Sequence, residues 1–221
     1  AEEQKITRFS DAVTFVSKAE TKLFQECQTN DEMRTLAQEK AFGVSSGVDS
    51  DYFSPDGEYE PPYDLSNPTY VFTGTMDYWP NVDAVTWFAK EILPLIRKSV
   101  HGATFYIVGN RPSKAVEELA AIDGVHVTGR VPDVRPYLAH ATAVVTPVRI
   151  ARGIQNKVFE AMAMARPVIT TPQALEGIDV DRDKEVFVVE TPDQIADIAI
   201  KLAQDSDSAS GIGELARKRV V

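Results

Sequence analysis

The stretch GIQNKVFEAMAMARPVIT, residues 153–170, decides the fold class of this chain. It predicts a loop that begins at Gly153, then an amphipathic helix, then a buried strand. The first turn of such a helix presents free backbone N–H groups and the positive end of the helix dipole, which together suit a phosphate. Glu160 lies about one turn inside the helix, where its carboxylate can accept hydrogen bonds from sugar hydroxyls. Phosphate beside sugar hydroxyls is the chemistry of a nucleotide sugar.

Strands and helices continue to alternate outward from this stretch, from Tyr70 to Ala203. The predicted strands are short, apolar and rich in Val and Ile, and they lie at residues 70–73, 104–108, 125–128, 143–146, 168–171 and 186–189. Helices are predicted between and after them, at residues 82–96, 114–121, 134–140, 157–164 and 195–203. Such strands are typical of a parallel sheet that helices cover on both faces. The sequence therefore predicts an α/β fold with a doubly wound, Rossmann-like parallel sheet.

A smaller region precedes this sheet. Residues 12–16 predict a strand, the capping-box pattern from Ser17 to Glu20 predicts the start of a helix, and residues 41–44 predict a second short strand. The segment 45–68 is polar, rich in Pro, Gly, Asp and Tyr, and without periodicity. We therefore expect a small N-terminal remnant at 1–44, an interdomain linker at 45–68 and the main domain at 69–221.

Composition limits the class of protein. The 221 residues carry a formal net charge of −10, which disfavours a nucleic-acid-binding protein because phosphate-backbone binding relies on a clustered positive field. The one cysteine, Cys27, has no internal disulfide partner, so a reducing compartment such as the cytoplasm is expected. No apolar run approaches the about 18–20 residues of a membrane span. The chain starts at Ala1 and ends within a helix-like pattern, so we expect a piece of a longer protein.

The loops that follow the predicted strands are the expected place for function, because ligands of such sheets bind beyond the carboxyl ends of the strands. The first of these loops begins at Gly74 and Thr75 and lacks both G-x-G-x-x-G and the phosphate-loop motif, which disfavours a dehydrogenase or an NTPase. Gly74 allows close backbone approach to a phosphate and Thr75 adds a hydroxyl, although a purely structural turn is the alternative.

A second loop, after residues 125–128, contains Arg130 and Val131. Its backbone amides can read the edge of a planar base while Val131 or Pro132 packs on the face of the base. The alternative is structural, because proline is favoured in the first turn of a helix.

Cations cluster before and inside the helix at 157–164. Arg149 and Arg152 precede it and suit a diphosphate, and Lys157 lies on the same side of the helix as Glu160. An exposed Lys157–Glu160 ion pair is the alternative. The three histidines show no ligand spacing, so no metal site is expected.

Several pieces of the chain resemble the C-terminal, donor-binding domain of retaining glycosyltransferases with the GT-B fold, the glycosyltransferase 4 group. They are residues 71–74, 105–109, 127–131 and 159–169. The segments 153–157 and 44–55 are similar to bacterial sugar transferases associated with exopolysaccharide and exosortase loci.

The resemblance implies roles for individual residues. Glu160 matches the second glutamate of the paired-glutamate motif, which binds the donor ribose, whereas the first glutamate falls on Arg152. The family often has an Arg and a Lys after the first strand of this domain, which hold the diphosphate. This chain has Met76 and Asn81 in that neighbourhood instead. We expect Arg152 and Lys157 to act on the departing diphosphate as the catalytic residues. The expected donor-binding residues are Gly74, Thr75, Arg130, Val131, Arg149, Gly153, Ile154, Gln155, Asn156 and Glu160.

The resemblance also implies a function. The chain is expected to bind a nucleoside diphosphate sugar, with a UDP-sugar as the expected donor and without a metal or other cofactor. The acceptor, a saccharide or lipid-linked sugar in polysaccharide synthesis, would bind the missing N-terminal domain, so this chain is expected to be inactive alone. The full-length enzyme would work in the cytoplasm, with room for peripheral association at the cytoplasmic face of the inner membrane. A UDP-sugar epimerase-like enzyme and a non-catalytic scaffold that binds no donor remain the alternatives.

Overall fold

The computed structural model describes residues 2–151 and 153–221, which form two compact units. The first unit comprises residues up to 47 together with 153–154 and 176–179. The second comprises 48–151, 155–175 and 180–221. The first break between the two units along the chain lies between Gly47 and Val48.

The first unit pairs two short parallel strands with three helices. Its elements are α1 (Glu2–Phe9), β1 (Val13–Phe15), α2 (Lys18–Glu26), α3 (Asp31–Lys40) and β2 (Ala41–Gly43). The Ser17 hydroxyl accepts the Glu20 N–H at 3.1 Å, so one half of the predicted capping box is present at the start of α2. The helix α3 was not predicted; its N-cap is Asn30, whose side chain accepts the Met33 N–H at 2.7 Å.

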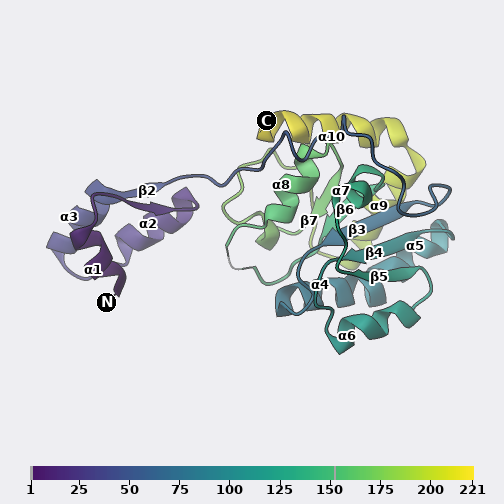
Figure 1. Ribbon diagram of the computed structural model, residues 1–221, viewed down its shortest axis with the longest axis horizontal. Helices are drawn as coiled ribbons and strands as arrows, with labels where there is room; N and C mark the ends of the chain where they lie inside the picture. The colour runs from purple at the N-terminus through teal and green to yellow at the C-terminus, as the bar shows by residue number, and fades with distance from the viewer. Residues whose placement is uncertain (1, 152) are drawn as a thin grey trace. The chain divides into compact units, whose positions relative to one another are not determined.

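The second unit is built on a six-stranded parallel sheet (Figure 1). Its strands are β3 (Thr69–Thr73), β4 (Thr104–Val108), β5 (Val125–Gly129), β6 (Ala143–Thr146), β7 (Val168–Thr170) and β8 (Phe187–Val188). Their spatial order is β5-β4-β3-β6-β7-β8. Counted from the first strand of this unit, the order is that of a doubly wound dinucleotide-type fold. The predicted fold class is confirmed, and β4 and β6 have their predicted bounds.

Helices lie between these strands and after the last of them. They are α4 (Trp79–Trp87), α5 (Leu93–Ser99), α6 (Lys114–Glu117), α7 (Arg135–Ala139), α8 (Asn156–Ala163), α9 (Pro192–Gln204) and α10 (Ser206–Val220). Short turns of 3-10 helix lie at Glu118–Ala121 and Gln173–Leu175. A π-helical turn, Phe88–Ile92, joins α4 to α5, and Pro94 follows it without a backbone N–H to continue the regular pattern.

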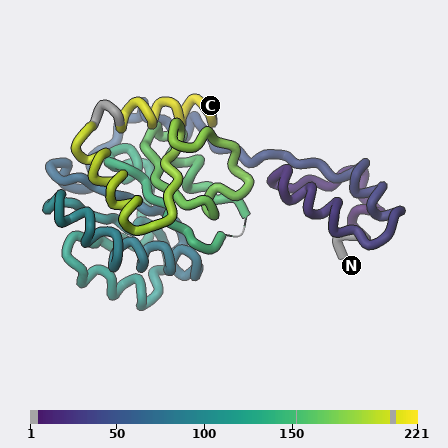
Figure 2. The backbone as a smooth tube through the Cα atoms, turned by 180° about the vertical axis from the view of Figure 1, so that it is seen from behind, coloured from purple at the N-terminus to yellow at the C-terminus, as the bar shows by residue number. Residues whose placement is uncertain are grey.

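The core lies on both faces of the sheet. On one face, the Tyr70 hydroxyl donates to the carbonyl of Ala199 in α9 at 2.7 Å, and the Phe88 ring packs 4.3 Å from the Phe105 ring. Tyr106, next to Phe105 in β4, points to the other face because side chains alternate along a strand. There its ring lies 6.2 Å from that of Tyr137 in α7. The C-terminal helix α10, yellow in Figure 2, packs beside α8.

Residues 48–68, here called the strap, lie along this second face instead of forming a free linker. The Tyr63 ring packs 4.7 Å from Tyr106, and its hydroxyl donates to the Tyr137 carbonyl at 2.9 Å. The His140 ring nitrogen Nε2 lies 2.7 Å from the Tyr59 carbonyl oxygen. The segment is irregular, as predicted, but it groups with the second unit from Val48 onward. This packing was not predicted, because the contacts of the strap join residues far apart in the chain.

The carboxyl ends of the central strands approach one another closely at two glycines. The Gly74 N–H donates to the Val108 carbonyl at 3.0 Å, and the Gly109 N–H donates to the Gly129 carbonyl at 3.3 Å. A Cβ atom added to Gly109 would lie 1.6 Å from the Gly74 carbonyl oxygen. Only glycine therefore allows the loops after β3 and β4 to meet in this way.

Gly109→Ala is expected to lower the free energy of unfolding by about 1–3 kcal/mol, because the loop backbone has to move away from Gly74. Urea denaturation followed by circular dichroism measures this change. Gly211→Ala is the matched control, because a Cβ there meets nothing within 4 Å and alanine favours the helix. Equal stability of the Gly109 variant and wild type would contradict the close approach.

Candidate functional site

The candidate site lies where the order of the strands reverses. The chain leaves β3 toward β4 on one side, and it leaves β6 toward β7 on the other side. In open α/β sheets this reversal opens a crevice at the carboxyl ends of the two strands, and ligands bind there. Gly74 follows β3, and α8 begins after the loop that follows β6. Both predicted halves of the site are therefore at the expected edge of the sheet.

Lys157, in the first turn of α8, reaches from one side of this crevice to the other. Its Nζ donates to Asn81 Oδ1 of α4 at 3.0 Å and to Gln155 Oε1 at 3.1 Å. The same Nζ lies 4.9 Å from the centre of the buried Phe72 ring in β3. Two neutral amide oxygens and an aromatic face thus surround the ammonium group.

The electrostatics of Lys157 follow from this setting. Burial lowers its pKa to about 8, while the Glu160 carboxylate acts in the opposite direction. No ion pair within 4.0 Å joins these two described residues, so the exposed pair offered as the alternative is not formed. The ammonium is a partly desolvated cation without a bonded anion. Such a group interacts strongly with an anionic ligand because water screens it weakly.

Glu160 lies one turn further along α8 and is half-buried. Burial raises the pKa of its carboxyl, and the charge of Lys157 offsets part of that rise. The described contacts include no hydrogen bond from a protein donor to its side chain. Its oxygens are therefore available to hydroxyl groups of a ligand.

Gly74, Thr75 and Asn81 form the opposite wall of the site. The Asn81 side-chain N–H donates to the Thr75 carbonyl at 3.0 Å, and a Cβ on Gly74 would lie 2.8 Å from Asn81 Nδ2 and 3.5 Å from Lys157 Cε. Asn81 is 5% exposed. From the sequence, Asn81 stands only where a cation is missing, whereas in the structure its Oδ1 holds Lys157. A polar residue within the apolar start of a helix is the signal that could have pointed to it.

The other predicted residues near the start of α8 are distributed differently. Gln155 is buried and precedes the exposed Asn156, the first residue of the helix. Gly153 and Ile154 group with the first unit. Arg152 lies outside the described residues.

Arg149 is held away from the role predicted for it. Its Nε donates to Asp83 Oδ2 of α4 at 3.0 Å, and its guanidinium carbon lies 4.8 Å from the centre of the Trp87 ring. No described contact joins it to Lys157 or Glu160. Asp83 neutralises the cation that was expected to be free for a diphosphate.

Arg130 and Val131 lie in the loop after β5, at the same edge of the sheet. Arg130 is exposed and Val131 is half-buried. The position proposed for Pro132 in the first turn of a helix is wrong, because α7 begins at Arg135 and its early proline is Pro136. The structural alternative for Pro132 therefore does not apply, because Pro132 lies in the irregular loop before the helix.

The described residues also bear on two further features: a metal site and a membrane-spanning helix. Within 2–151 and 153–221, no group of three or more His, Cys, Asp or Glu side chains is placed to hold a metal ion. The helices in the same part of the chain are all too short or too polar to cross a membrane.

Comparisons with known proteins agree on the fold. TarM of S. aureus superposes with a TM-score of 0.76 at 16% identity, over 100% of this chain and 42% of TarM. HepE of Anabaena, solved with UDP and glucose, gives 0.70 at 16% identity, over 96% of this chain and 59% of HepE. A glycosyltransferase from Rickettsia africae gives 0.70 at 19% identity, over 98% of this chain and 62% of that protein.

These similarities show the Rossmann-like C-terminal half of a GT-B glycosyltransferase, and the chain spans about half the length of the structures it matches. No curated protein matches the chain. A family model described as glycosyl transferases group 1 matches residues 67–205, well over half of the chain. The chain therefore belongs to the glycosyl transferases group 1 family.

Proposed function

We propose that this chain is the donor-binding part of a retaining glycosyltransferase of the glycosyltransferase 4 group. It binds a nucleoside diphosphate sugar, with UDP as the expected nucleotide, and serves transfer to a saccharide or lipid-linked acceptor in exopolysaccharide synthesis. The acceptor binds the N-terminal domain, so this chain alone has little or no transferase activity. We place the full-length enzyme in the cytoplasm, with peripheral association at the inner membrane.

One observation carries the proposal. Lys157 is a desolvated cation that neutral amides of Asn81 and Gln155 hold at the crevice between β3 and β6. Glu160 lies one turn away with its carboxylate available. This combination offers positive charge to a diphosphate and an acceptor to ribose hydroxyls. HepE, which shares the fold, has been solved with UDP-glucose, and this supports the choice of nucleotide.

The same residues suggest how this half of the enzyme contributes to transfer. As the bond from the sugar to the diphosphate breaks, negative charge grows on the leaving phosphate. Lys157 and the backbone N–H groups at the start of α8 stabilise that charge, and they need no titrating acid or base in this domain. Arg152 remains a candidate for the same role.

A non-catalytic scaffold is the second candidate. The observation that favours it is the Arg149–Asp83 contact, which removes one of the expected cations from the donor site. An epimerase-like enzyme is less favoured, because the loop before Glu160 lacks a Ser-Gly-Gly phosphate cradle.

A thermal-shift screen with UDP, GDP, ADP and their sugars tests the proposal. A nucleotide at about 100 times its Kd is expected to add about 2.7 kcal/mol to the free energy of unfolding. A scaffold would show no shift with any of them. Transferase turnover by the purified chain would contradict the expected dependence on the N-terminal domain.

Glu160→Ala is expected to weaken binding of the preferred nucleotide by about 1.5–3 kcal/mol, because charge-assisted hydrogen bonds to the ribose are lost. Titration calorimetry measures this, and circular dichroism checks that the fold is intact. Affinity equal to that of wild type would remove Glu160 from the site.

The affinity for a nucleoside diphosphate is expected to fall as the pH rises above about 8. The free protein has a Lys157 pKa of about 8, so the ammonium is charged below that pH and neutral above it. A bound diphosphate favours the charged form, so binding above pH 8 requires uptake of a proton. The affinity should therefore fall by up to about tenfold per pH unit, as measured by calorimetry between pH 7 and 9.5.

Lys157→Arg and Lys157→Met are the matched controls for this pH dependence. Arginine stays charged over the whole range, so the affinity of the Lys157→Arg variant for the nucleoside diphosphate should stay constant with pH. Methionine keeps the apolar stem without charge, so its affinity should be low and constant. A fall with pH in either variant would show that another group titrates.

A further inference from the structure

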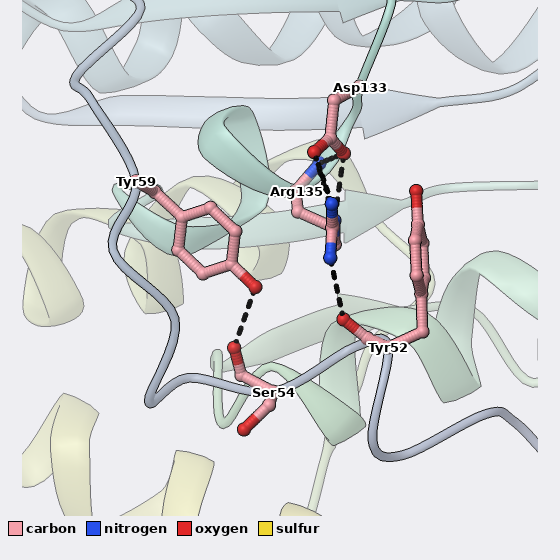
Figure 3. A network of polar contacts seen from close by, with 5 residues as sticks. All are labelled: Tyr52, Ser54, Tyr59, Asp133 and Arg135. Atoms are coloured by element: carbon pink, nitrogen blue, oxygen red, sulfur yellow. Dashed lines mark hydrogen bonds and ion pairs between the residues drawn. The ribbon is translucent and has the colours of Figure 1, made fainter.

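The loop after β5, which is expected from the sequence to read the base, is clamped to the strap through Arg135. The guanidinium carbon of Arg135 lies 3.8 Å from the centre of the Tyr52 ring and 5.6 Å from that of Tyr59. Figure 3 shows the guanidinium between these two rings, with its outer end directed at the Tyr52 carbonyl. The distance from Arg135 Nη1 to that carbonyl oxygen is 3.2 Å. The side chain thus joins α7 to a segment more than seventy positions earlier in the chain.

The Asp133 carboxylate binds the side of the Arg135 guanidinium that does not face the Tyr52 carbonyl. Arg135 Nε donates to both carboxylate oxygens, at 3.0 and 2.9 Å, and Nη2 donates to Oδ2 at 2.7 Å. Asp133 Oδ1 also accepts the backbone N–H of Arg135 at 2.9 Å. These bonds lower the pKa of the Asp133 carboxyl, with the side-chain hydrogen bond as the main cause. Two residues therefore lock the side chain and the backbone of the loop together.

The remaining part of the strap supports this clamp. The Tyr59 hydroxyl donates to the Ser54 carbonyl at 2.9 Å, which closes the strap on itself beside the guanidinium (Figure 3). Arg217 of α10 donates to the Phe53 carbonyl at 3.2 Å. The Tyr52 backbone that faces Arg135 is thus held from the side of α10 as well.

The outer part of the loop is open, in contrast to its clamped inner part. A Cβ on Gly129 would meet nothing within 4 Å, and Arg130 is exposed. In a loop of this kind the outer residues are free to contact a ligand, while the inner residues are fixed. If the loop were mobile, a ligand that hydrogen-bonds its amides would first have to order it, which weakens binding.

We propose that Arg135, Asp133 and Tyr52 are positioning residues for recognition of the nucleotide base. They hold the backbone N–H groups of Val131, Asp133 and Val134 in place, and the strap is thereby a part of the donor site. This inference rests on the proposed function for its ligand. The simpler alternative is a surface ion pair that stabilises the domain and affects every ligand equally.

Arg135→Met tests the proposal, because methionine keeps an apolar side chain beside Tyr52 and removes the bonds to Asp133. Calorimetry compares the affinity for UDP with the affinity for inorganic pyrophosphate, which has no base. The variant is expected to lose about tenfold or more in affinity for UDP and less than about twofold for pyrophosphate. Asp133→Ala should give the same pattern, and the double variant should add little, because the two residues act as one unit.

Tyr63→Phe is the matched control. It removes the bond to the Tyr137 carbonyl, which also fastens the strap, but leaves the ring on Tyr106 and the clamp at Arg135 intact. This variant should change the melting temperature without changing the ratio of the two affinities. A similar change of the ratio in Tyr63→Phe, or equal losses for both ligands in Arg135→Met, would overturn the proposal.

A measurement without ligand separates this inference from the proposed function. Amide hydrogen exchange at Val131, Asp133 and Val134 is expected to be faster in Arg135→Met than in wild type, and unchanged in Tyr63→Phe. Unchanged exchange in Arg135→Met would overturn the positioning role, whether or not a nucleotide binds. If exchange is faster but wild type does not bind UDP more tightly than pyrophosphate, base recognition at this site is refuted, and the positioning proposal falls with it.

Discussion

The parallel pairing of β3 with both β4 and β6 is the constraint on which the second unit depends. It places the fully buried β3 at the centre of the sheet and sends the chain in opposite directions on its two sides. At the edge of the crevice that results, Gly74 leaves room for the side chains of Asn81 and Lys157, and Lys157 carries its charge across to Asn81.

Much of this arrangement could be predicted from the sequence. Buried parallel strands are continuous apolar runs, so β4 and β6 could be located to the residue. Glu160 and Lys157 could be placed together because residues three apart share a helix face. The polar helix α3 escaped prediction, because its apolar residues are few and its cap at Asn30 lies in a region without clear periodicity.

The partners of charged side chains could not be predicted in the same way. The Arg149 side chain donates to Asp83, and the Lys157 side chain donates to Asn81. In both pairs the residues are more than sixty positions apart in the chain. A count of cations near the start of α8 therefore overestimates the charge that a ligand meets. The strap illustrates the same limit, since its composition predicts a linker while its tyrosines pack on Tyr106 and around Arg135. Packing of this kind depends on the whole fold and leaves no local pattern.

The low pKa of Lys157 has a consequence for its chemical reactivity. An amine attacks acylating reagents only in its neutral form, and an ordinary lysine is neutral in less than about 1% of molecules at pH 8. With a pKa of about 8, Lys157 is neutral in about half of them. At this pH a larger fraction of Lys157 than of an ordinary lysine is therefore in the reactive neutral form, and a ligand that restores its charge removes this difference. Covalent labelling of Lys157 can thus show whether a ligand occupies the site. This readout needs no turnover of a substrate.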